Sequence, residues 1–186
     1  MIWIFVLKSL WFFLPAYFAN MAPTFAKKAG ILKSLAKPID FKKNFKGKPI
    51  FGSHKTWRGM ISGIVLGILI SYFQKFLFQF SFFQKISFLN YQKLNVFFLG
   101  FLLSFGALFG DLISSFFKRR KSIEPGNPWI PFDQISFVIG AFFLVNIFSD
   151  FKIPIFAWVL ILILSFFLHI LGNRIGFWLE ISDSKI

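Results

Sequence analysis

Apolar residues along the chain fall into five long runs, at about residues 2–22, 60–83, 94–117, 132–149 and 153–171. A helix of about 20 apolar residues is long enough to cross the hydrocarbon part of a bilayer. A chain of 186 residues cannot bury so many apolar residues in water, because small domains have a high ratio of surface to volume. The pattern therefore predicts an all-α integral membrane protein, a bundle of about five transmembrane helices that forms one domain over residues 1–186.

Two of the runs carry polar interruptions. The second run contains Gln74, Lys75 and Gln79 in its far half, so we expect it to leave the membrane near Tyr72 and continue as an amphipathic helix at the interface. The first run contains Lys8 and is longer than the apolar core of a usual signal peptide. We therefore expect the first run to be retained as a helix.

The loops between the runs differ sharply in charge. Residues 27–58 carry nine lysines and one arginine against one acidic residue, Asp40, and residues 118–121 are four consecutive bases. The second and fourth loops hold only Lys75, Lys85, Lys93 and Lys152. Because basic loops stay in the cytoplasm, we expect a multi-pass protein of the cell membrane with the first and third loops inside, the N-terminus outside and the C-terminus in the cytoplasm.

The composition supports the prediction of a membrane protein and excludes some kinds of partner and site. Hydrophobic residues make up 56% of the chain, and 32 residues are Phe. The formal net charge of +14 would suit nucleic acid in a soluble protein, but basic loops beside a membrane meet anionic head groups instead, so we expect no nucleic-acid partner. The sequence has no cysteine, which excludes disulfides and thiolate metal sites.

A basic segment flanked by glycines precedes the second run, with the sequence Gly-Ser-His-Lys-Thr-Trp-Arg-Gly over residues 52–59. Lys55 offers a point charge and Arg58 a planar fork, with the Thr56 hydroxyl between them, a combination that suits a phosphate group. The start of the following helix would add its positive end. The alternative is a basic stripe beside the membrane that only contacts lipid head groups.

A carboxylate stands inside the third run. Asp111, Ser115 and Lys118 are spaced i, i+4 and i+7, so they share one face of a helix, and Arg119 and Arg120 follow directly. An ionised Asp in the membrane costs on the order of 3 kcal/mol on insertion scales, so Asp111 needs a partner, a metal ion or a wet cavity. The alternative to a functional site is an internal Asp111–Lys118 ion pair that holds the bundle together.

A second acidic position, Asp133, is followed by Gln134 at the start of the fourth run, after a proline-rich loop. Asp133 is expected on the same side of the membrane as Asp111, which makes a divalent-cation site possible. Mg²⁺ takes one or two carboxylates and completes its shell with substrate phosphates and water. The alternative role for Asp133 is a helix N-cap, and the two roles are compatible.

Four further polar positions are less informative alone. His169 and Asn173 are four residues apart near the expected inner end of the last run, where such a pair is more often structural than catalytic. Asn20 lies near an inner helix end and Asp40 lies in the basic first loop. All of these positions nevertheless fall on the face that charge counting assigns to the cytoplasm.

Taken together, these segments resemble the CDP-archaeol synthase family from Pro15 to Asn173. The resemblance rests on residues 14–23, Pro38-Ile-Asp40, residues 52–59, Gly110-Asp111 through Arg120, Asp133-Gln134 and His169-x3-Asn173, in this order. The family is similar in its C-terminal half to phosphatidate cytidylyltransferase. The resemblance implies a membrane enzyme that transfers CMP from CTP to the phosphate of 2,3-bis-O-geranylgeranyl-sn-glycerol, giving a CDP-archaeol-type lipid and pyrophosphate at a cytoplasmic active site.

The resemblance also implies roles for the polar residues. Asp111 and Asp133 would hold Mg²⁺ and, with Lys118 and Arg119, form the catalytic group. The remaining positions would bind the nucleotide or the lipid phosphate: Lys55, Thr56, Arg58, Ser115, Arg120, Gln134, Asp40, Asn20, His169 and Asn173. The implied partners are CTP, a lipid phosphate and the membrane.

One position departs from the family pattern. The family usually carries a second Asp three residues after the first in an Asp-Gln-x-Asp motif, and here that position is Ser136. A hydroxyl can coordinate Mg²⁺ but supplies no charge. Two alternatives therefore stay open: a phosphatidate cytidylyltransferase acting on diacyl phosphatidic acid, and a membrane protein that binds anionic lipid or conducts anions without catalysis.

Overall fold

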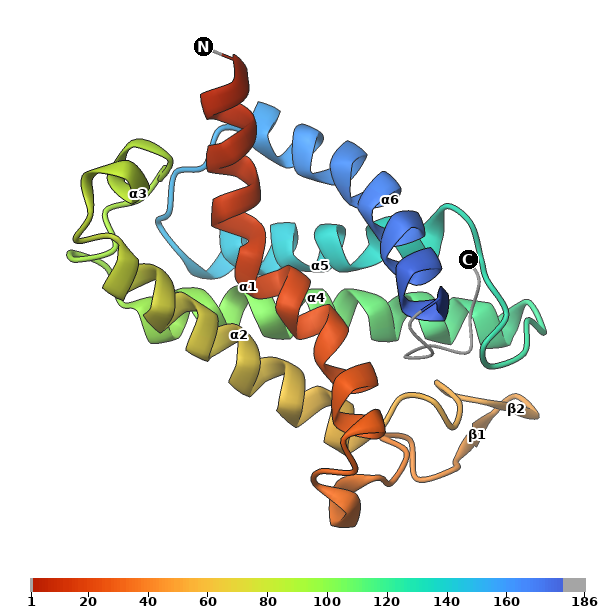
Figure 1. Cartoon of the computed structure of the whole chain (residues 1–186). Helices are drawn as coiled ribbons and strands as arrows, with labels where there is room; N and C mark the ends of the chain where they lie inside the picture. The colour runs from red at the N-terminus through yellow and green to blue at the C-terminus, as the bar shows by residue number, and fades with distance from the viewer. Residues whose placement is uncertain (1, 179–186) are drawn as a thin grey trace.

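The computed structural model of the chain describes residues 2–178, without the side chains of residues 173, 176 and 177 (Figure 1). Its helices are α1 (Ile2–Lys28), α2 (Trp57–Leu77), α3 (Ser81–Lys85), α4 (Val96–Arg120), α5 (Phe132–Phe148) and α6 (Ile155–Trp178). The first loop adds a short 3₁₀ helix, η1 (Lys33–Leu35), and a two-stranded antiparallel hairpin, β1 (Asn44–Phe45) and β2 (Lys48–Pro49).

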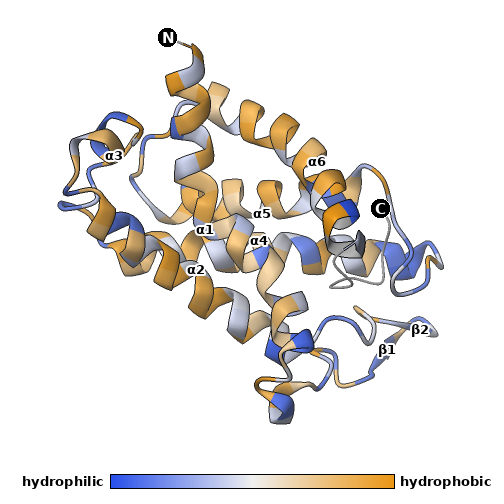
Figure 2. Ribbon diagram, in the orientation of Figure 1, coloured by the Kyte–Doolittle hydropathy of each residue, from blue (hydrophilic) through white to orange (hydrophobic). Residues whose placement is uncertain are grey.

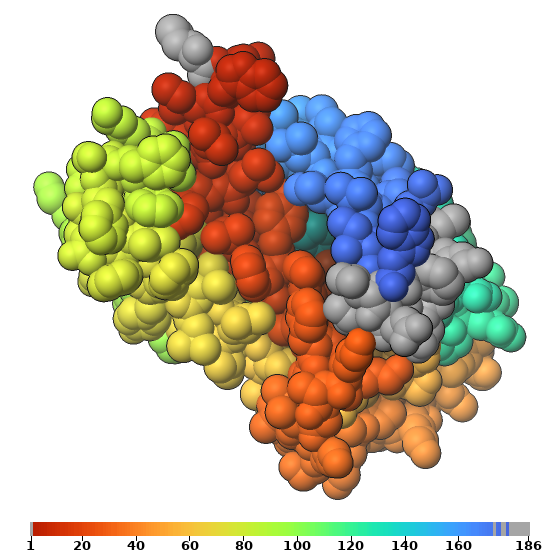
Figure 3. Space-filling model, viewed as in Figure 1, coloured from red at the N-terminus to blue at the C-terminus, as the bar shows by residue number. Residues whose placement is uncertain are grey.

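The helices confirm the expected helical membrane bundle. Among the described residues, α1, α2, α4 and α6 are long and apolar enough to cross a bilayer, and α5 is a shorter apolar helix of 17 residues. Figure 2 shows apolar residues along the bodies of these helices and polar residues mainly at helix ends and in the connecting loops. In the space-filling view, α1 runs between α2 and α3 on one side and α6 on the other (Figure 3).

The second run differs from its prediction. The run does not continue as one helix: α2 ends at Leu77, and a break precedes the separate short helix α3. The expected interruption at Gln74 is fully buried, and its side-chain amide donates to the carbonyl of Trp11. A helical carbonyl normally accepts from the residue four positions later, which here is Pro15 and has no N–H. Gln74 therefore satisfies the acceptor that Pro15 leaves open.

Small residues allow α2 to lie directly against α1. A Cβ on Gly63 would come within 2.7 Å of the carbonyl oxygen of Ala19, and a Cβ on Gly67 would collide with Ser104 of α4. The Ala19 carbonyl is the one that Pro23 leaves without a helical donor. Glycines four residues apart thus bring the two backbones together, as in other tightly packed membrane helices.

Glycines also determine how α4 meets α5. A Cβ on Gly106 would lie 2.7 Å from the Cα of Ala141, and a Cβ on Gly110 would collide with the Ser136 carbonyl. Gly140 on α5 faces Gly110 in the same way. This close approach fixes α5 beside the stretch of α4 that carries the polar residues discussed below.

The two basic loops meet at one end of the bundle. The end of α4, the start of α5, the end of α6 and the β1–β2 hairpin lie near one another in Figure 1. Lys48 of the hairpin donates to the Arg120 carbonyl at 3.0 Å and to the Ser122 hydroxyl at 2.6 Å. The first and third loops are therefore on the same face, as their shared basic charge predicted.

Candidate active site

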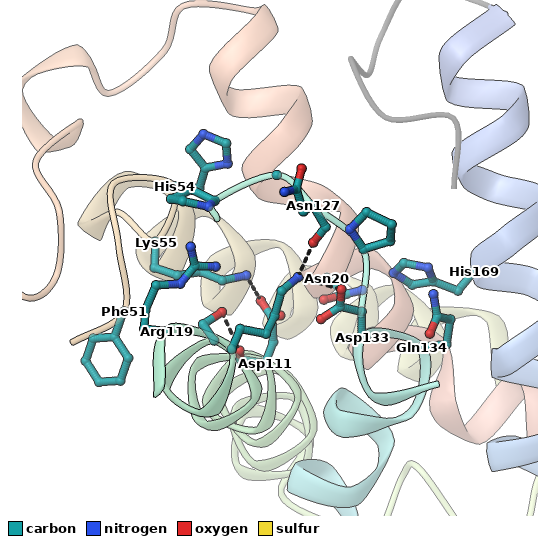
Figure 4. A pocket seen from close by; sticks show the side chains of 15 residues that line it. Asn20, Phe51, His54, Lys55, Asp111, Arg119, Asn127, Asp133, Gln134 and His169 are labelled. Carbon is teal, nitrogen blue, oxygen red and sulfur yellow. Dashed lines mark hydrogen bonds and ion pairs between the residues drawn. The ribbon is translucent and has the colours of Figure 1, made fainter. Parts of the chain in front are cut away.

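A cavity opens where these helix ends and loops meet (Figure 4). It is lined by Asn20, Phe51, His54, Lys55, Asp111, Ser115, Lys118, Arg119, Pro125, Gly126, Asn127, Pro128, Asp133, Gln134 and His169. The lining comes from α1, both basic loops, α4, α5 and α6. Its volume of about 210 Å³ far exceeds the roughly 10–15 Å³ that one water requires, so the charged groups stand in a space that solvent can enter.

One face of α4 supplies the polar floor of the cavity. Asp111, Ser115 and Lys118 all line it, as their i, i+4, i+7 spacing predicts. The Ser115 hydroxyl donates to the Asp111 carbonyl at 2.9 Å. The tight α4–α5 contact at Gly110 holds this face beside the first turn of α5, where Asp133 lies.

The two carboxylates of the cavity are each paired with a lysine from another element. Asp111 forms an ion pair with Lys55 of the first loop, and Lys118 forms one with Asp133, with 2.6 Å between Nζ and Oδ2. The Asp111–Lys118 pair considered as an alternative is therefore not the arrangement in the structure. The pairing that is present joins α4 to the first loop and to α5, because it crosses between elements.

Asp133 is not the cap of α5. Pro131 occupies that position, and Asp133 lies in the first turn of the helix. Its carboxylate accepts from the backbone N–H of Trp129 at 2.8 Å as well as from Lys118. Lys118 in turn donates to the carbonyl of Asn127 at 2.6 Å. The Asp133–Lys118 pair therefore also shapes the third loop that covers the cavity.

Two buried side chains of the lining hold polar atoms without partners among the described residues. Arg119 is 6% exposed, and its Nε and one Nη lack acceptors. Gln134 is 1% exposed, and its Oε1 lacks a donor. Leaving a buried donor or acceptor unpaired is costly, and a guanidinium matches phosphate oxygens geometrically. This arrangement favours a ligand that is anionic near Arg119.

Part of the basic segment over residues 52–59 enters the cavity and part does not. Lys55 and the neighbouring His54 line it. Thr56 is the N-cap of α2, where its hydroxyl accepts from the N–H of Gly59 at 3.2 Å. Arg58 lies in the first turn of α2, outside the lining. The structure therefore brings one of the three predicted phosphate-binding side chains of this segment to the site.

Asp40 lies outside the lining and shapes the first loop instead. Its buried carboxylate accepts from the backbone N–H groups of Lys42, Phe51 and Gly52 at 2.9–3.0 Å. Desolvation alone would raise the pKa of Asp40, but these backbone hydrogen bonds outweigh it and hold the pKa below its usual value. Phe51 is itself part of the lining, so Asp40 positions a wall of the cavity.

Arg120 also lies outside the lining. Its guanidinium donates to the carbonyls of Phe45, Lys48 and Pro49. It stacks over the ring of Phe116, 5.0 Å from the ring centroid. Arg120 therefore attaches the β1–β2 hairpin to the end of α4.

The weaker polar positions divide in the same way. Asn20 and His169 line the cavity, and the His169 ring lies beside Phe137. The side chain of Asn173 is outside the described part of the structure. Sequence reasoning did not select Phe51 or Asn127, and it included His54 only as a member of the segment over residues 52–59. Their contribution comes from loop geometry, which has no periodicity to reveal it.

Within residues 2–178, no three His, Cys, Asp or Glu side chains gather into a ready-made metal site. Asp111 and Asp133 are the acidic side chains of the lining. Mg²⁺ commonly binds through one or two carboxylates and takes its other ligands from phosphates and water. The donor set of this cavity fits that kind of ion when a phosphate substrate is present.

Comparison with known proteins gives a consistent result. The family model described as CDP-archaeol synthase (CarS-like) matches residues 1–185. The CDP-archaeol synthase of Methanocaldococcus jannaschii is 38% identical over 176 residues, 94% of each chain. Those of Pyrococcus furiosus and Archaeoglobus fulgidus are each 40% identical, over 73% and 78% of this chain and 72% and 77% of their own. A solved structure described as an intramembrane enzyme for archaeal membrane lipid biosynthesis shares the fold, with a TM-score of 0.71 at 24% identity, covering 90% of this chain and 94% of that one.

Proposed function

The chain belongs to the CDP-archaeol synthase family, and on that premise we propose that it transfers CMP from CTP to a membrane lipid phosphate, 2,3-bis-O-geranylgeranyl-sn-glycerol 1-phosphate. The observation that carries this proposal is one cavity that combines Lys55, Lys118 and Arg119 with the carboxylates of Asp111 and Asp133. Cationic side chains neutralise phosphates, and the carboxylates provide oxygen ligands for a divalent cation. The position of the cavity at the ends of membrane helices suits one soluble substrate and one lipid substrate.

In the proposed reaction, an oxygen of the lipid phosphate attacks the α-phosphorus of CTP, and the bond from that phosphorus to the bridging oxygen of pyrophosphate breaks. No strong base is required, because a phosphate monoester is largely dianionic near neutral pH. The protein's task is to position two anionic groups and to neutralise their charge. Lys118 and Arg119, which both line the cavity, are the side chains proposed to neutralise the pyrophosphate charge that develops as the bond breaks.

The cofactor proposed for this site is Mg²⁺, held by Asp111 and Asp133. When bound, the ion would neutralise negative charge on the phosphates during transfer. The lysines that now pair with these carboxylates would then be available to the substrate phosphates. Ser115 lies one turn after Asp111 on the same face, and Asn20, Gln134 and His169 supply neutral polar groups around the ligand.

The proposed orientation places the cavity in the cytoplasm, with the N-terminus outside and the C-terminus inside. The support is the concentration of lysine and arginine in the first and third loops together with the contact between those loops in the structure. Cytoplasmic loops carry an excess of basic residues. CTP and Mg²⁺ would then reach the site from the cytoplasm.

The proposal is tested with the full chain purified in detergent. CTP labelled at the α-phosphate is supplied with Mg²⁺, and the geranylgeranyl ether lipid phosphate and a diacyl phosphatidic acid are offered in parallel. Label in the ether lipid is the expected result. Label in the ester lipid alone would move the substrate assignment to phosphatidic acid, and label in neither lipid, from protein that binds CTP, would overturn the proposed transfer.

A further inference from the structure

An exposed aromatic pair lies where the first loop meets the start of α2, outside the cavity lining. The rings of Phe41 and Trp57 stand 6.4 Å apart between centroids, and the two residues are 61% and 38% exposed. Backbone pairing brings them together, because Ile39 donates to the Lys55 carbonyl at 2.8 Å and Trp57 donates to the Lys37 carbonyl at 3.0 Å. The pair is therefore built by the fold, not by a chance contact of mobile side chains.

The turn that presents Phe41 has an unusual backbone. Phe41 and Lys42 are consecutive non-glycine residues with positive φ angles, 49° and 62°. Side chains rarely adopt this region, and such positions persist where the surrounding structure holds them. Here Asp40 holds the turn by accepting from the N–H of Lys42. Conformations of this kind cluster at functional sites, and this one projects a large apolar ring outward.

Exposed lysines are close to the pair in the sequence, and the pair lies at the start of a membrane helix. Lys37, Lys42 and Lys43 are all exposed, and no acidic side chain lies between residues 41 and 57 in the sequence. Trp57 is the first residue of α2, which is long and apolar enough to span a bilayer. Aromatic rings at helix ends reside at the level of lipid head groups.

We infer that this part of the protein is a docking surface for anionic head groups of the surrounding membrane. We call it the interfacial platform, and it consists of Phe41, Trp57, Lys37, Lys42 and Lys43. The positive lysines attract these negatively charged lipids, and each lysine near an anionic surface strengthens association about fivefold. The rings enter the interfacial region beside the head groups. This combination of bases and outward rings fits a lipid surface, which accepts both kinds of side chain at one depth.

Docking of the platform has a consequence for the cavity. The carboxylate of Asp40 joins the Phe41–Lys42 turn to the N–H groups of Phe51 and Gly52. Phe51 lines the cavity, and a Cβ on Gly52 would contact Arg119. A first loop held against the membrane would therefore keep this wall of the cavity in place. The docking surface does not depend on which lipid phosphate is the substrate.

The test uses the absence of cysteine from the sequence. A single Asn44→Cys substitution in the exposed hairpin accepts one fluorophore, and the protein is placed in nanodiscs of phosphatidylcholine alone or of phosphatidylcholine with phosphatidylglycerol. A lipid with a quencher on its head group reports contact of the loop with the membrane. We expect stronger quenching in the anionic discs. This increase should be lost at high salt, because salt screens the attraction between exposed lysines and anionic head groups.

A variant combining Phe41→Ser, Lys42→Gln and Lys43→Gln should lower the ratio of docked to undocked loop in anionic discs about 25-fold, the product of two fivefold lysine contributions. A matched control removes an exposed ring and two exposed lysines from the opposite end: Phe82→Ser, Lys85→Gln and Lys93→Gln. The control should leave the quenching unchanged. Three results would each overturn the inference. The quenching could be equal in neutral and anionic discs, it could be unchanged in the platform variant, or CTP alone could induce contact in neutral discs.

Discussion

The side-chain amide of Gln74 and the backbone carbonyl of Trp11 form a hydrogen bond between α2 and α1. The bond is buried in the bundle, and Pro15 is the reason that the carbonyl is available. Replacement of Gln74 by Leu should lower the free energy of unfolding by about 1–3 kcal/mol, the usual cost of leaving a buried acceptor unpaired. Unfolding in detergent, followed by circular dichroism, measures the loss.

The same pair offers a double-mutant test. A Pro15→Ala substitution restores the N–H that a helix supplies to the Trp11 carbonyl, so Gln74→Leu should cost less in that background than in the natural sequence. Equal costs in both backgrounds would show that Gln74 contributes by packing alone.

Gly110, at the α4–α5 contact, should tolerate no side chain. Gly110→Ala should lower stability by about 1–3 kcal/mol, as overpacking does, because its Cβ would collide with the Ser136 carbonyl. It should also reduce activity, since the neighbouring Asp111 would move with α4. Gly172→Ala is the matched control, because a Cβ there meets nothing within 4 Å. A Gly110→Ala protein as stable and active as this control would contradict the close packing.

Lys118 should be important for transfer and for the shape of the third loop. Lys118→Gln removes the ion pair with Asp133 and a positive charge that the proposed transition state requires, so we expect kcat to fall by about 100-fold or more. Transfer of α-labelled CMP into lipid measures kcat. Lys121→Gln removes a neighbouring exposed charge and should retain nearly full activity, because Lys121 is outside the lining.

Asp111 should control the dependence on the divalent cation. Asp111→Asn leaves Lys55 without its charged partner and removes a proposed ligand of Mg²⁺, so activity should fall by about 100-fold or more and require higher Mg²⁺. A Mg²⁺ titration of activity separates the two effects. Asp150→Asn, in the loop between α5 and α6, serves as the control. An Asp111→Asn protein with an unchanged Mg²⁺ titration would remove Asp111 from the metal site.

Asp40 should make the first loop sensitive to acid. Its pKa is lowered in the folded protein, so its stabilising contribution is fully present above the ordinary Asp pKa of about 3.9. The contribution is lost as the pH falls through the lower folded pKa. Limited proteolysis of the first loop across this range measures the effect. The first loop of the Asp40→Asn protein should be cleaved faster near neutral pH, and its cleavage should no longer depend on acid. A loop equally protected from cleavage in both proteins would contradict the role of Asp40.

The sequence predicted the membrane bundle well, because the length of an apolar run directly indicates whether a helix can cross a bilayer. It also predicted that Asp111, Ser115 and Lys118 share a face, because helical spacing alone decides that. The ion-pair partners were beyond its reach: Lys55 pairs with Asp111 only because the first loop folds back over α4. Thr56 caps α2, Asp40 stabilises the first loop and Arg120 holds the β1–β2 hairpin. Backbone geometry, which the sequence does not show, sets these roles.

Ser136 shows the same limit. The sequence identified it as the place where a second carboxylate is missing, but not what surrounds it. The structure places its hydroxyl in a buried position without a partner among the described residues, with its carbonyl against Gly110. It is outside the cavity lining. Tertiary packing between two helices, not local pattern, determines its environment.

The cavity takes residues from nearly the whole length of the chain, from Asn20 on α1 to His169 on α6. A nascent chain that has inserted α1, α2, α4 and α5 but not α6 therefore lacks His169 of the lining. Assembly of the site must wait until α6 is delivered to the membrane. An incompletely synthesised chain would then hold a membrane position without a complete site for its substrates, so biogenesis itself would limit when activity can begin.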